Sequence, residues 1–235
     1  MSTNERHYCM GIASANLSQQ DKDRLAGHRA ALLNGARWDT GSTVTVRFLD
    51  GSEDLKKRVK KVAQEWTAPG MANLTLEFRN NGPTDVRIAF EQGNGSWSYI
   101  GTMCRQIAEP EPTMNYGWLT DVSPEEELRR VVIHEFGHAL GLIHEHQNPK
   151  GGIKWNKDAV VKDLKGPPNN WDLPTIENNM FKKYLPGEVT ATNVDASSIM
   201  MYPIPKAWTA DGFSAGLNAD FSQKDRELIR SVYPQ

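Results

Sequence analysis

Residues 134–146 read HEFGHALGLIHEH and hold four of the six histidines in a chain of 235 residues. On an α-helix, residues four apart lie one turn above each other, so His134 and His138 project from the same face. Glu135 is offset from His134 by about 100° around the helix and can approach a metal-bound water without ligating the metal. This spacing is the H-E-x-x-H motif, in which two histidines bind zinc and the glutamate acts as a general base.

A third zinc ligand is expected at His144. Catalytic zinc usually takes three protein ligands and leaves a position for water. If the helix continued, His144 would lie roughly 240° around the axis from His138, far from the ligating face. The helix must therefore end between them, and Gly141 can adopt the left-handed conformation that turns a chain at a helix C-terminus.

Hydrophobic periodicity outward from this motif predicts an α+β chain. Strands are expected within 43–51, 73–80, 85–92, 96–102 and 113–120, and helices within 52–67, 124–142, 172–184 and 222–233. Residues 1–40 form a polar N-terminal lead that we expect to be loosely packed and that is a candidate latency or accessory segment. The catalytic domain is expected over 41–235, with one subdomain at 41–146 and a loop-rich one at 147–235.

The composition excludes several classes of function. The chain has 27 Lys and Arg against 29 Asp and Glu, a formal net charge of −2, which gives no bias toward nucleic acid or an anionic membrane. We expect neither a transmembrane segment nor a signal peptide, because no apolar run is long enough for either. The compartment is left open between the cytoplasm and secretion with the signal removed. No calcium site is expected, and a monomer is the expected state.

A second motif lies in the C-terminal half, where residues 197–202 read SSIMMY. Together with the extended histidine motif, this stretch resembles the metzincin zinc endopeptidases and, within them, the astacin family with its Ser-x-Met-x-Tyr turn. The resemblance covers about residues 43–233 and includes Glu145, which follows the third histidine. Two cysteines are too few for the disulfides of animal members, so a distant bacterial or fungal type is expected.

The resemblance implies a zincin fold and roles for two further residues. The fold would be a twisted, mostly parallel sheet with two long helices above the loop-rich subdomain, and one zinc ion would lie in the cleft between them. Met200 would form the hydrophobic floor under the three histidines. Tyr202 would be a switchable fifth zinc ligand that swings away to hydrogen-bond the oxyanion when substrate enters.

Substrate contacts are expected on both sides of the metal. An extended polypeptide would pair with an exposed edge strand, for which we select residues 95–101 with Trp97 and Tyr99; the alternative is an internal hairpin strand. By the family resemblance, Ile204 and Trp208 would line the pocket after the scissile bond, which favours an apolar or uncharged side chain there.

Three states remain open for the cysteines. Cys9 as a thiolate can occupy the fourth position of zinc and keep the enzyme latent, since zinc accepts sulfur readily. Alternatively, Cys9 pairs with Cys104 in a disulfide, or both are free or buried thiols.

The function predicted from the sequence is zinc-dependent hydrolysis of peptide bonds in extended polypeptides, by metal-activated water with Glu135 as general base. Two alternatives are a catalytically silent zinc-containing binding module and a small-substrate zinc amidase or dipeptidase. His146 falls outside the ligand spacing and is expected in a hydrogen-bonding or surface role.

Overall fold

The computed structural model describes residues 8–12, 34–167, 169–183 and 193–235. Its strands are β1 Met10–Ile12, β2 Thr43–Phe48, β3 Thr75–Phe78, β4 Val86–Ala89, β5 Ser96–Tyr99 and β6 Met114–Tyr116. Its α-helices are α2 Glu53–Ala63, α3 Glu125–Ala139, α4 Lys157–Lys165, α5 Leu173–Ile176 and α6 Gln223–Val232. Shorter helical turns are η1 Asn34–Ala36, η2 Gln64–Thr67, η3 Gly101–Gln106, η4 Glu145–Gln147, η5 Glu177–Phe181 and η6 Lys206–Trp208. The expected α+β class is confirmed.

The strands form one sheet in the order β1-β5-β6-β4-β2-β3. β5 is antiparallel to β6, whereas the other neighbouring strands are parallel. This is the mostly parallel sheet that the resemblance implied. Strand β1 was not predicted, because three residues are too few for an alternating pattern to stand out.

Two long helices pack with the sheet around the larger apolar cluster of the described residues, which we call the first core. Ser52 caps α2 by accepting a hydrogen bond from the Leu55 amide at 3.1 Å, as expected from an N-cap serine. After α2 the fully buried Trp66 donates its indole N–H to the Ile133 carbonyl of α3 at 3.0 Å. The two helices pack against each other, and α3 also contacts β5 and β6. The sheet therefore supports the helix that carries the histidine motif.

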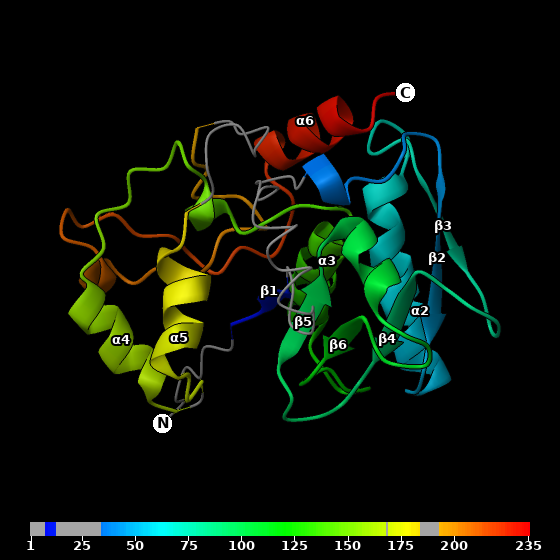
Figure 1. Ribbon diagram of the computed structural model, residues 1–235, viewed down its shortest axis with the longest axis horizontal. Helices are drawn as coiled ribbons and strands as arrows, with labels where there is room; N and C mark the ends of the chain where they lie inside the picture. Colours follow the sequence, from blue (N-terminus) through cyan, green and yellow to red (C-terminus); the bar gives the residue numbers. More distant parts are fainter. Residues whose placement is uncertain (1–7, 13–33, 168, 184–192) are drawn as a thin grey trace.

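The C-terminal half has a smaller apolar cluster of its own, around α4, α5 and the turns near Trp208. Figure 1 shows α4 and α5 on the side of the molecule away from β2 and β3, with α3 between them. Helix α6 returns to the first core, where Ile229 and Val232 are buried. Tyr233 then donates its hydroxyl to the Leu140 carbonyl at 2.7 Å, which ties the C-terminus to the end of α3.

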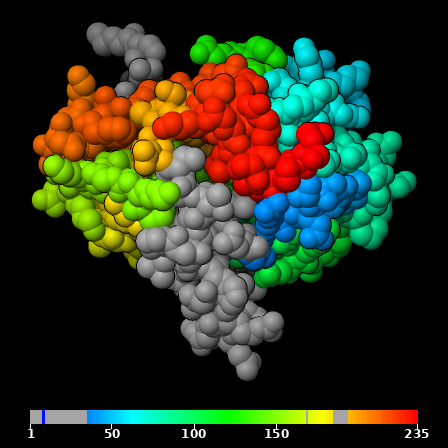
Figure 2. Space-filling view, turned by 90° about the horizontal axis from the view of Figure 1, so that it is seen from above, coloured from blue at the N-terminus to red at the C-terminus, as the bar shows by residue number. Residues whose placement is uncertain are grey.

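The described part of the N-terminal lead is packed more tightly than expected. Ala36 and Trp38 are buried, and the Trp38 indole donates to the Ala139 carbonyl at 2.8 Å. Arg37 hydrogen-bonds the Val232 carbonyl, and Figure 2 shows this segment beside the C-terminal helix. Trp38 is thus part of the first core. The prediction of a loosely packed lead missed it because it rested on the mostly polar composition of residues 1–40 as a whole. The rest of the lead, 1–7 and 13–33, lies outside the described residues.

Candidate active site

The turn after α3 brings the third histidine to the first two. Gly141 has a φ of 100°, the left-handed region expected for it. Its amide donates to the His138 carbonyl at 2.8 Å, and the Leu142 amide donates to the Gly137 carbonyl at 2.9 Å. This pair of bonds is the Schellman motif that ends a helix at a glycine. The chain then reverses and presents His144 toward α3.

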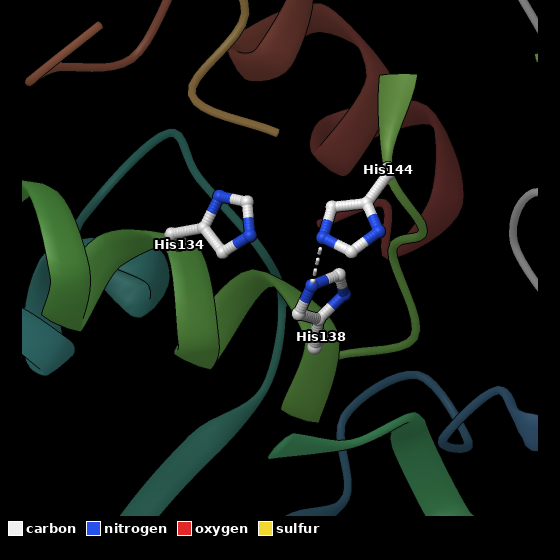
Figure 3. A group of neighbouring side chains, drawn as sticks. All are labelled: His134, His138 and His144. Atoms are coloured by element: carbon white, nitrogen blue, oxygen red, sulfur yellow. Dashed lines mark hydrogen bonds between the residues drawn. The ribbon is translucent and has the colours of Figure 1, made fainter. Parts of the chain in front are cut away.

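The three predicted ligands converge, with His134 and His138 on α3 and His144 on the segment after it (Figure 3). One ligand atom from each lies within 4.8 Å of the others, and all three side chains are buried. The His138 and His144 Nε2 atoms are 3.1 Å apart. Two nitrogens bound to one tetrahedral zinc at about 2.0–2.1 Å would be roughly 3.3 Å apart, so the spacing fits one ion.

Hydrogen bonds set the tautomers of the first two histidines. His134 Nδ1 lies 2.8 Å from the Ile199 carbonyl, and His138 Nδ1 lies 2.8 Å from the Leu142 carbonyl. A carbonyl only accepts, so each Nδ1 carries the proton and each Nε2 lone pair is free for a metal. Burial also lowers the pKa of His138 to about 4 and holds the pKa of His134 and His144 well below the usual value. The buried His134 Nε2 has no hydrogen-bond partner among the described residues. This donor set fits zinc.

Met200 packs against α3 at Gly137, and its role as the floor under the three histidines stays a prediction. A Cβ built at Gly137 would meet the Met200 Sδ at 2.4 Å, so the methionine approaches the helix where that residue has no side chain. Both Met200 and the neighbouring Ile199 are buried. The turn at 198–201 therefore packs against α3, and the glycine is what allows its approach.

Helix α6 anchors that turn through Asp225. Its carboxylate accepts hydrogen bonds from the Ser198 hydroxyl at 2.6 Å and from the Ile199 amide at 2.9 Å. The same carboxylate accepts from the Ser222 amide at 2.9 Å, within the capping box of α6. Because the Ile199 carbonyl accepts from the His134 imidazole, Asp225 holds the residue that orients His134, the first predicted ligand.

Glu135 is fully buried beside the histidines. Neither of its carboxylate oxygens accepts a hydrogen bond from an N–H or O–H group of the described residues, and the Cys9 thiol lies beside the carboxylate. Burial raises the pKa of Glu135 well above its usual value. A buried acid with no N–H or O–H partner among the described residues favours a catalytic role over a packing one.

Tyr202 lies against the third ligand. Its ring centroid is 4.2 Å from that of His144, and its hydroxyl donates a hydrogen bond to the Cys9 carbonyl. Burial holds the pKa of Tyr202 well above its usual value, so the hydroxyl keeps its proton. The phenol is therefore a hydrogen-bond donor aimed at a peptide carbonyl beside the three histidines.

The model of the astacin peptidase family matches residues 33–233. The chain belongs to the astacin family.

Solved structures agree with this assignment. The structure of myroilysin is 42% identical to this astacin, covers 86% of this chain and 97% of its own, and superposes with a TM-score of 0.83. High choriolytic enzyme 1, a hatching enzyme zinc-protease from Oryzias latipes, is 15% identical, covers 85% of this chain and 94% of its own, and has a TM-score of 0.51. The second likeness shows a shared fold, and together they confirm the expected astacin-like metzincin fold.

Curated relatives of this astacin are named as zinc metalloproteinases. The dpy-31 enzyme of Brugia malayi is 29% identical over 174 residues, which is 71% of this chain and 24% of the relative. The nas-24 enzyme of Caenorhabditis elegans is 26% identical over 150 residues, 60% of this chain and 33% of the relative. The family is one of zinc metallopeptidases, the enzyme class expected from the sequence, although the chain spans a third or less of these relatives. None of the described helices is apolar over a length sufficient to cross a bilayer.

The N-terminal segment, defined as residues 8–12, lies along β5 and beside His134 and Glu135. β1 pairs in parallel with β5, so that Met10 lies opposite Trp97 and Ile12 opposite Tyr99. The predicted edge strand is therefore not exposed, because the chain covers it with its own backbone. Trp97 remains half-buried, whereas the Tyr99 side chain packs into the first core.

Cys9 lies beside His134 and Glu135 and is not bonded to Cys104. One ligand atom each from Cys9, His134 and Glu135 lies within 4.8 Å of the others. Both cysteines are buried free thiols, so the disulfide alternative is not the one observed. Burial raises the pKa of the Cys104 thiol to about 12, as expected for an inert core cysteine.

The two residues predicted for the pocket lie in the smaller apolar cluster. Trp208 and Ile204 are buried there together with Tyr8. The Trp208 ring stacks on Tyr8 with centroids 5.6 Å apart, whereas the Ile204 backbone pairs with Ala215. The structure therefore brings Trp208 against the N-terminal segment and leaves the substrate role of Ile204 a prediction.

Glu145 and His146, the last two residues of 134–146, form hydrogen bonds to residues outside that stretch. His146 is buried, lies 2.7 Å from the Asn179 carbonyl through Nε2, and stacks on Tyr202 at 4.7 Å. It hydrogen-bonds, as expected, and is not on the surface. Glu145 accepts from the Asn148 side chain at 3.2 Å and the Asp195 amide at 3.1 Å, and burial raises its pKa to about 7.

Three residues at the site were missed by sequence reasoning. Gly137 left a signal, because a glycine inside a helix costs about 1 kcal/mol against alanine and often marks close packing. Asp225 showed only as part of a capping box, Ser222 to Asp225, which indicates where a helix starts but not what else the carboxylate reaches. Tyr8 left no signal, since its contacts are all distant in sequence.

Proposed function

We propose that this astacin is a zinc-dependent endopeptidase that hydrolyses extended polypeptides, with Glu135 as its general base. The observation that carries the proposal is the pairing of three buried, neutral histidines with a buried carboxylate that accepts no N–H or O–H hydrogen bond from the described residues. A binding module that only held zinc would have no use for that acid, which lies at the site at the cost of its desolvation.

His134, His138 and His144 would hold the ion. When bound, zinc supplies Lewis acidity, polarising the scissile carbonyl and bringing the pKa of a water toward neutrality. The three imidazoles are fit for this because carbonyl partners on two of them orient the rings and keep the Nε2 atoms unprotonated.

Glu135 would accept the proton of the attacking water and deliver it to the leaving amine. No N–H or O–H group of the described residues binds its carboxylate, and the Cys9 thiol beside it would leave with the N-terminal segment, so both oxygens would then be available for this transfer. Burial favours the neutral form of Glu135. A zinc ion held by the three histidines would favour the ionised form that accepts a proton.

Tyr202 would donate its hydroxyl to the oxyanion that develops on the scissile carbonyl. Support comes from its present bond, because the carbonyl of Cys9 is already a peptide oxygen within its reach. A substrate carbonyl placed in the same position would receive the same donor.

The substrate would lie along β5 as an added strand. β1 supports this, since it shows that the outer edge of β5 accepts an extended chain beside the histidines. Trp97, half-buried on this strand, is then the side chain available to a substrate, more than the buried Tyr99.

The N-terminal segment would hold the enzyme latent until it is displaced. It covers β5, engages Tyr202 and brings the Cys9 thiol near the ligand atoms. If Cys9 occupies the position of the attacking water, Cys9→Ser raises peptidase activity of the full chain, because serine binds zinc more weakly than a thiolate does. Activity unchanged by Cys9→Ser would remove the thiol from the latency mechanism, with Cys104→Ser as the matched control.

The proposal is tested by cleavage of an unfolded protein and of blocked and free dipeptides, with the full chain and its Cys9→Ser form. We expect the unfolded protein to be cut, cleavage to stop after chelation, and stoichiometric zinc to restore it. Zinc binding without any cleavage would establish a silent module instead. Cleavage confined to the dipeptides would establish a small-substrate enzyme.

A further inference from the structure

Tyr8 fills an aromatic pocket beside the catalytic residues. Its ring is stacked on Trp208 at 5.6 Å between centroids, and meets Tyr202 edge-on at 5.2 Å and Trp171 edge-on at 6.2 Å. Its hydroxyl donates to the Pro203 carbonyl at 3.3 Å. Tyr8 is only 6% exposed, so its ring is almost completely enclosed.

Two of the residues that form the pocket also have hydrogen bonds outside the N-terminal segment. The Trp208 indole donates to the Asp163 carboxylate of α4 at 2.6 Å, and the Trp171 amide donates to the Leu164 carbonyl at 2.9 Å. The slot is the space between the rings of Trp171, Tyr202 and Trp208, with the Pro203 carbonyl as a hydrogen-bond acceptor at its end. Such a site suits a flat side chain that is apolar along its length and polar at its tip.

The residue that follows Tyr8 in the chain lies beside the predicted catalytic residues. Cys9 follows Tyr8, its carbonyl receives the Tyr202 hydroxyl, and its thiol lies within 4.8 Å of the His134 and Glu135 ligand atoms. A peptide whose carbonyl takes the place of the Cys9 carbonyl therefore presents a neighbouring side chain to the slot.

There is also room for the rest of a polypeptide. A cavity of about 600 Å³ opens beside Tyr8, between the glycine loop at 93–95 and the segment from Trp171 to Thr175. A chain leaving the slot can continue into this cavity without moving either wall.

We propose that Trp171, Tyr202 and Trp208 form a substrate subsite that takes an aromatic side chain, tyrosine or phenylalanine, at the residue next to the one that bears the scissile carbonyl. This rests on the endopeptidase function proposed above and assigns it a substrate class. Tyr8 occupies the subsite in the chain as it stands, so the N-terminal segment is held by the same contacts that select the substrate.

The first test is cleavage-site profiling of a peptide library by the Cys9→Ser chain and by Tyr8→Ala in the same background. We expect tyrosine and phenylalanine at one of the two residues adjacent to the one that bears the scissile carbonyl, preferred over alanine by roughly tenfold or more in kcat/KM, the factor that burying an aromatic ring gives. Trp171→Ala should reduce that preference to a few-fold while cleavage of alanine peptides continues, and Trp171→Phe should retain it. Efficient cleavage with no aromatic preference at either position overturns the proposal while leaving the endopeptidase function intact.

The second test does not depend on catalysis. Binding of N-acetyl-tyrosinamide and N-acetyl-alaninamide to the Tyr8→Ala chain is measured through tryptophan fluorescence. Saturable binding of the tyrosine amide alone, weakened by Trp171→Ala and kept by Trp171→Phe, supports the subsite even if no peptide bond is cut. Equal responses to the two amides, or a tyrosine response that Trp171→Ala leaves unchanged, refute it.

Discussion

Replacing Asp225 is predicted to loosen the zinc site from a distance. The carboxylate accepts hydrogen bonds from the Ser198 hydroxyl, the Ile199 amide and the Ser222 amide, at 2.6, 2.9 and 2.9 Å. The Ile199 carbonyl in turn receives His134, so the substitution reaches a metal ligand through one residue. Asp225→Ala therefore tests whether the C-terminal helix positions the metal centre.

The expected cost of Asp225→Ala follows from the three bonds. Hydrogen bonds to a charged group contribute about 1.5–3 kcal/mol each, and an unsatisfied buried amide costs about 1–3 kcal/mol. The exposed end of α6 can regain a bond to water, and burying the carboxylate already opposes ionisation, since the pKa of Asp225 is raised. We therefore expect a net loss of about 3–4 kcal/mol in the free energy of unfolding, less than the simple sum.

Asp225→Asn should be milder. One amide oxygen can still accept from the two backbone N–H groups, and the amide N–H can donate to the Ser198 oxygen, so a loss of about 1 kcal/mol is expected. Zinc affinity should fall roughly 10- to 100-fold for the alanine variant and less for the asparagine variant, as for other groups that orient metal ligands.

The assay is urea unfolding followed by tryptophan fluorescence, together with zinc competition against a chromogenic chelator. Asp220→Ala is the matched control, because its carboxylate is 59% exposed and pairs with Arg129 and Arg226 at the surface. That control should lose no more than about 1 kcal/mol and keep its zinc affinity. A folded Asp225→Ala chain that binds zinc as tightly as Asp220→Ala would refute the positioning role.

Three further substitutions test other parts of the structure. Gly137→Ala places a Cβ 2.4 Å from the Met200 Sδ, so overpacking should outweigh the gain in helix propensity and cost about 1–2 kcal/mol in urea unfolding, whereas a stabilised variant would contradict the close approach. Burial raises the pKa of Tyr233 to about 12, so the stability this phenol contributes is present below pH 10 and is lost as pH rises toward 12; Tyr233→Phe should reduce the alkaline fall in unfolding free energy by up to about 3 kcal/mol, and an identical fall in both chains would count against the assignment. Tyr202→Phe in the Cys9→Ser chain should lower kcat by about 100-fold with zinc content unchanged, and an unaltered kcat would exclude it as the oxyanion donor.

Local patterns predicted most of the elements. The alternation in 43–48 and the helical spacing from Leu55 to Val62 each place apolar side chains on one face, and that face is buried in the structure. The motif from His134 to His144 likewise needs only helix geometry and one glycine, so its convergence could be argued before any fold was known.

Contacts between distant segments could not be predicted in this way. Tyr8 reaches the Pro203 carbonyl across 195 positions, and Asp225 reaches Ile199 across 26. Hydrophobic periodicity predicts which face of an element is buried, but it does not predict which distant residue Tyr8 or Asp225 will contact. The covered edge of β5 was missed for the same reason, because a three-residue strand has too few positions to show alternation.

The central claim is tested most directly by cleavage of an unfolded protein by Glu135→Gln, in a chain that also carries Cys9→Ser. Glu126→Gln is the control, an exposed glutamate near the start of the same helix. We predict that Glu135→Gln binds zinc with the stoichiometry of its parent, stays folded, and loses kcat by about 100-fold or more, as expected for removal of a general base, while Glu126→Gln cuts at the parental rate. Cleavage by the zinc-loaded Glu135→Gln chain at the rate of the control would contradict the account.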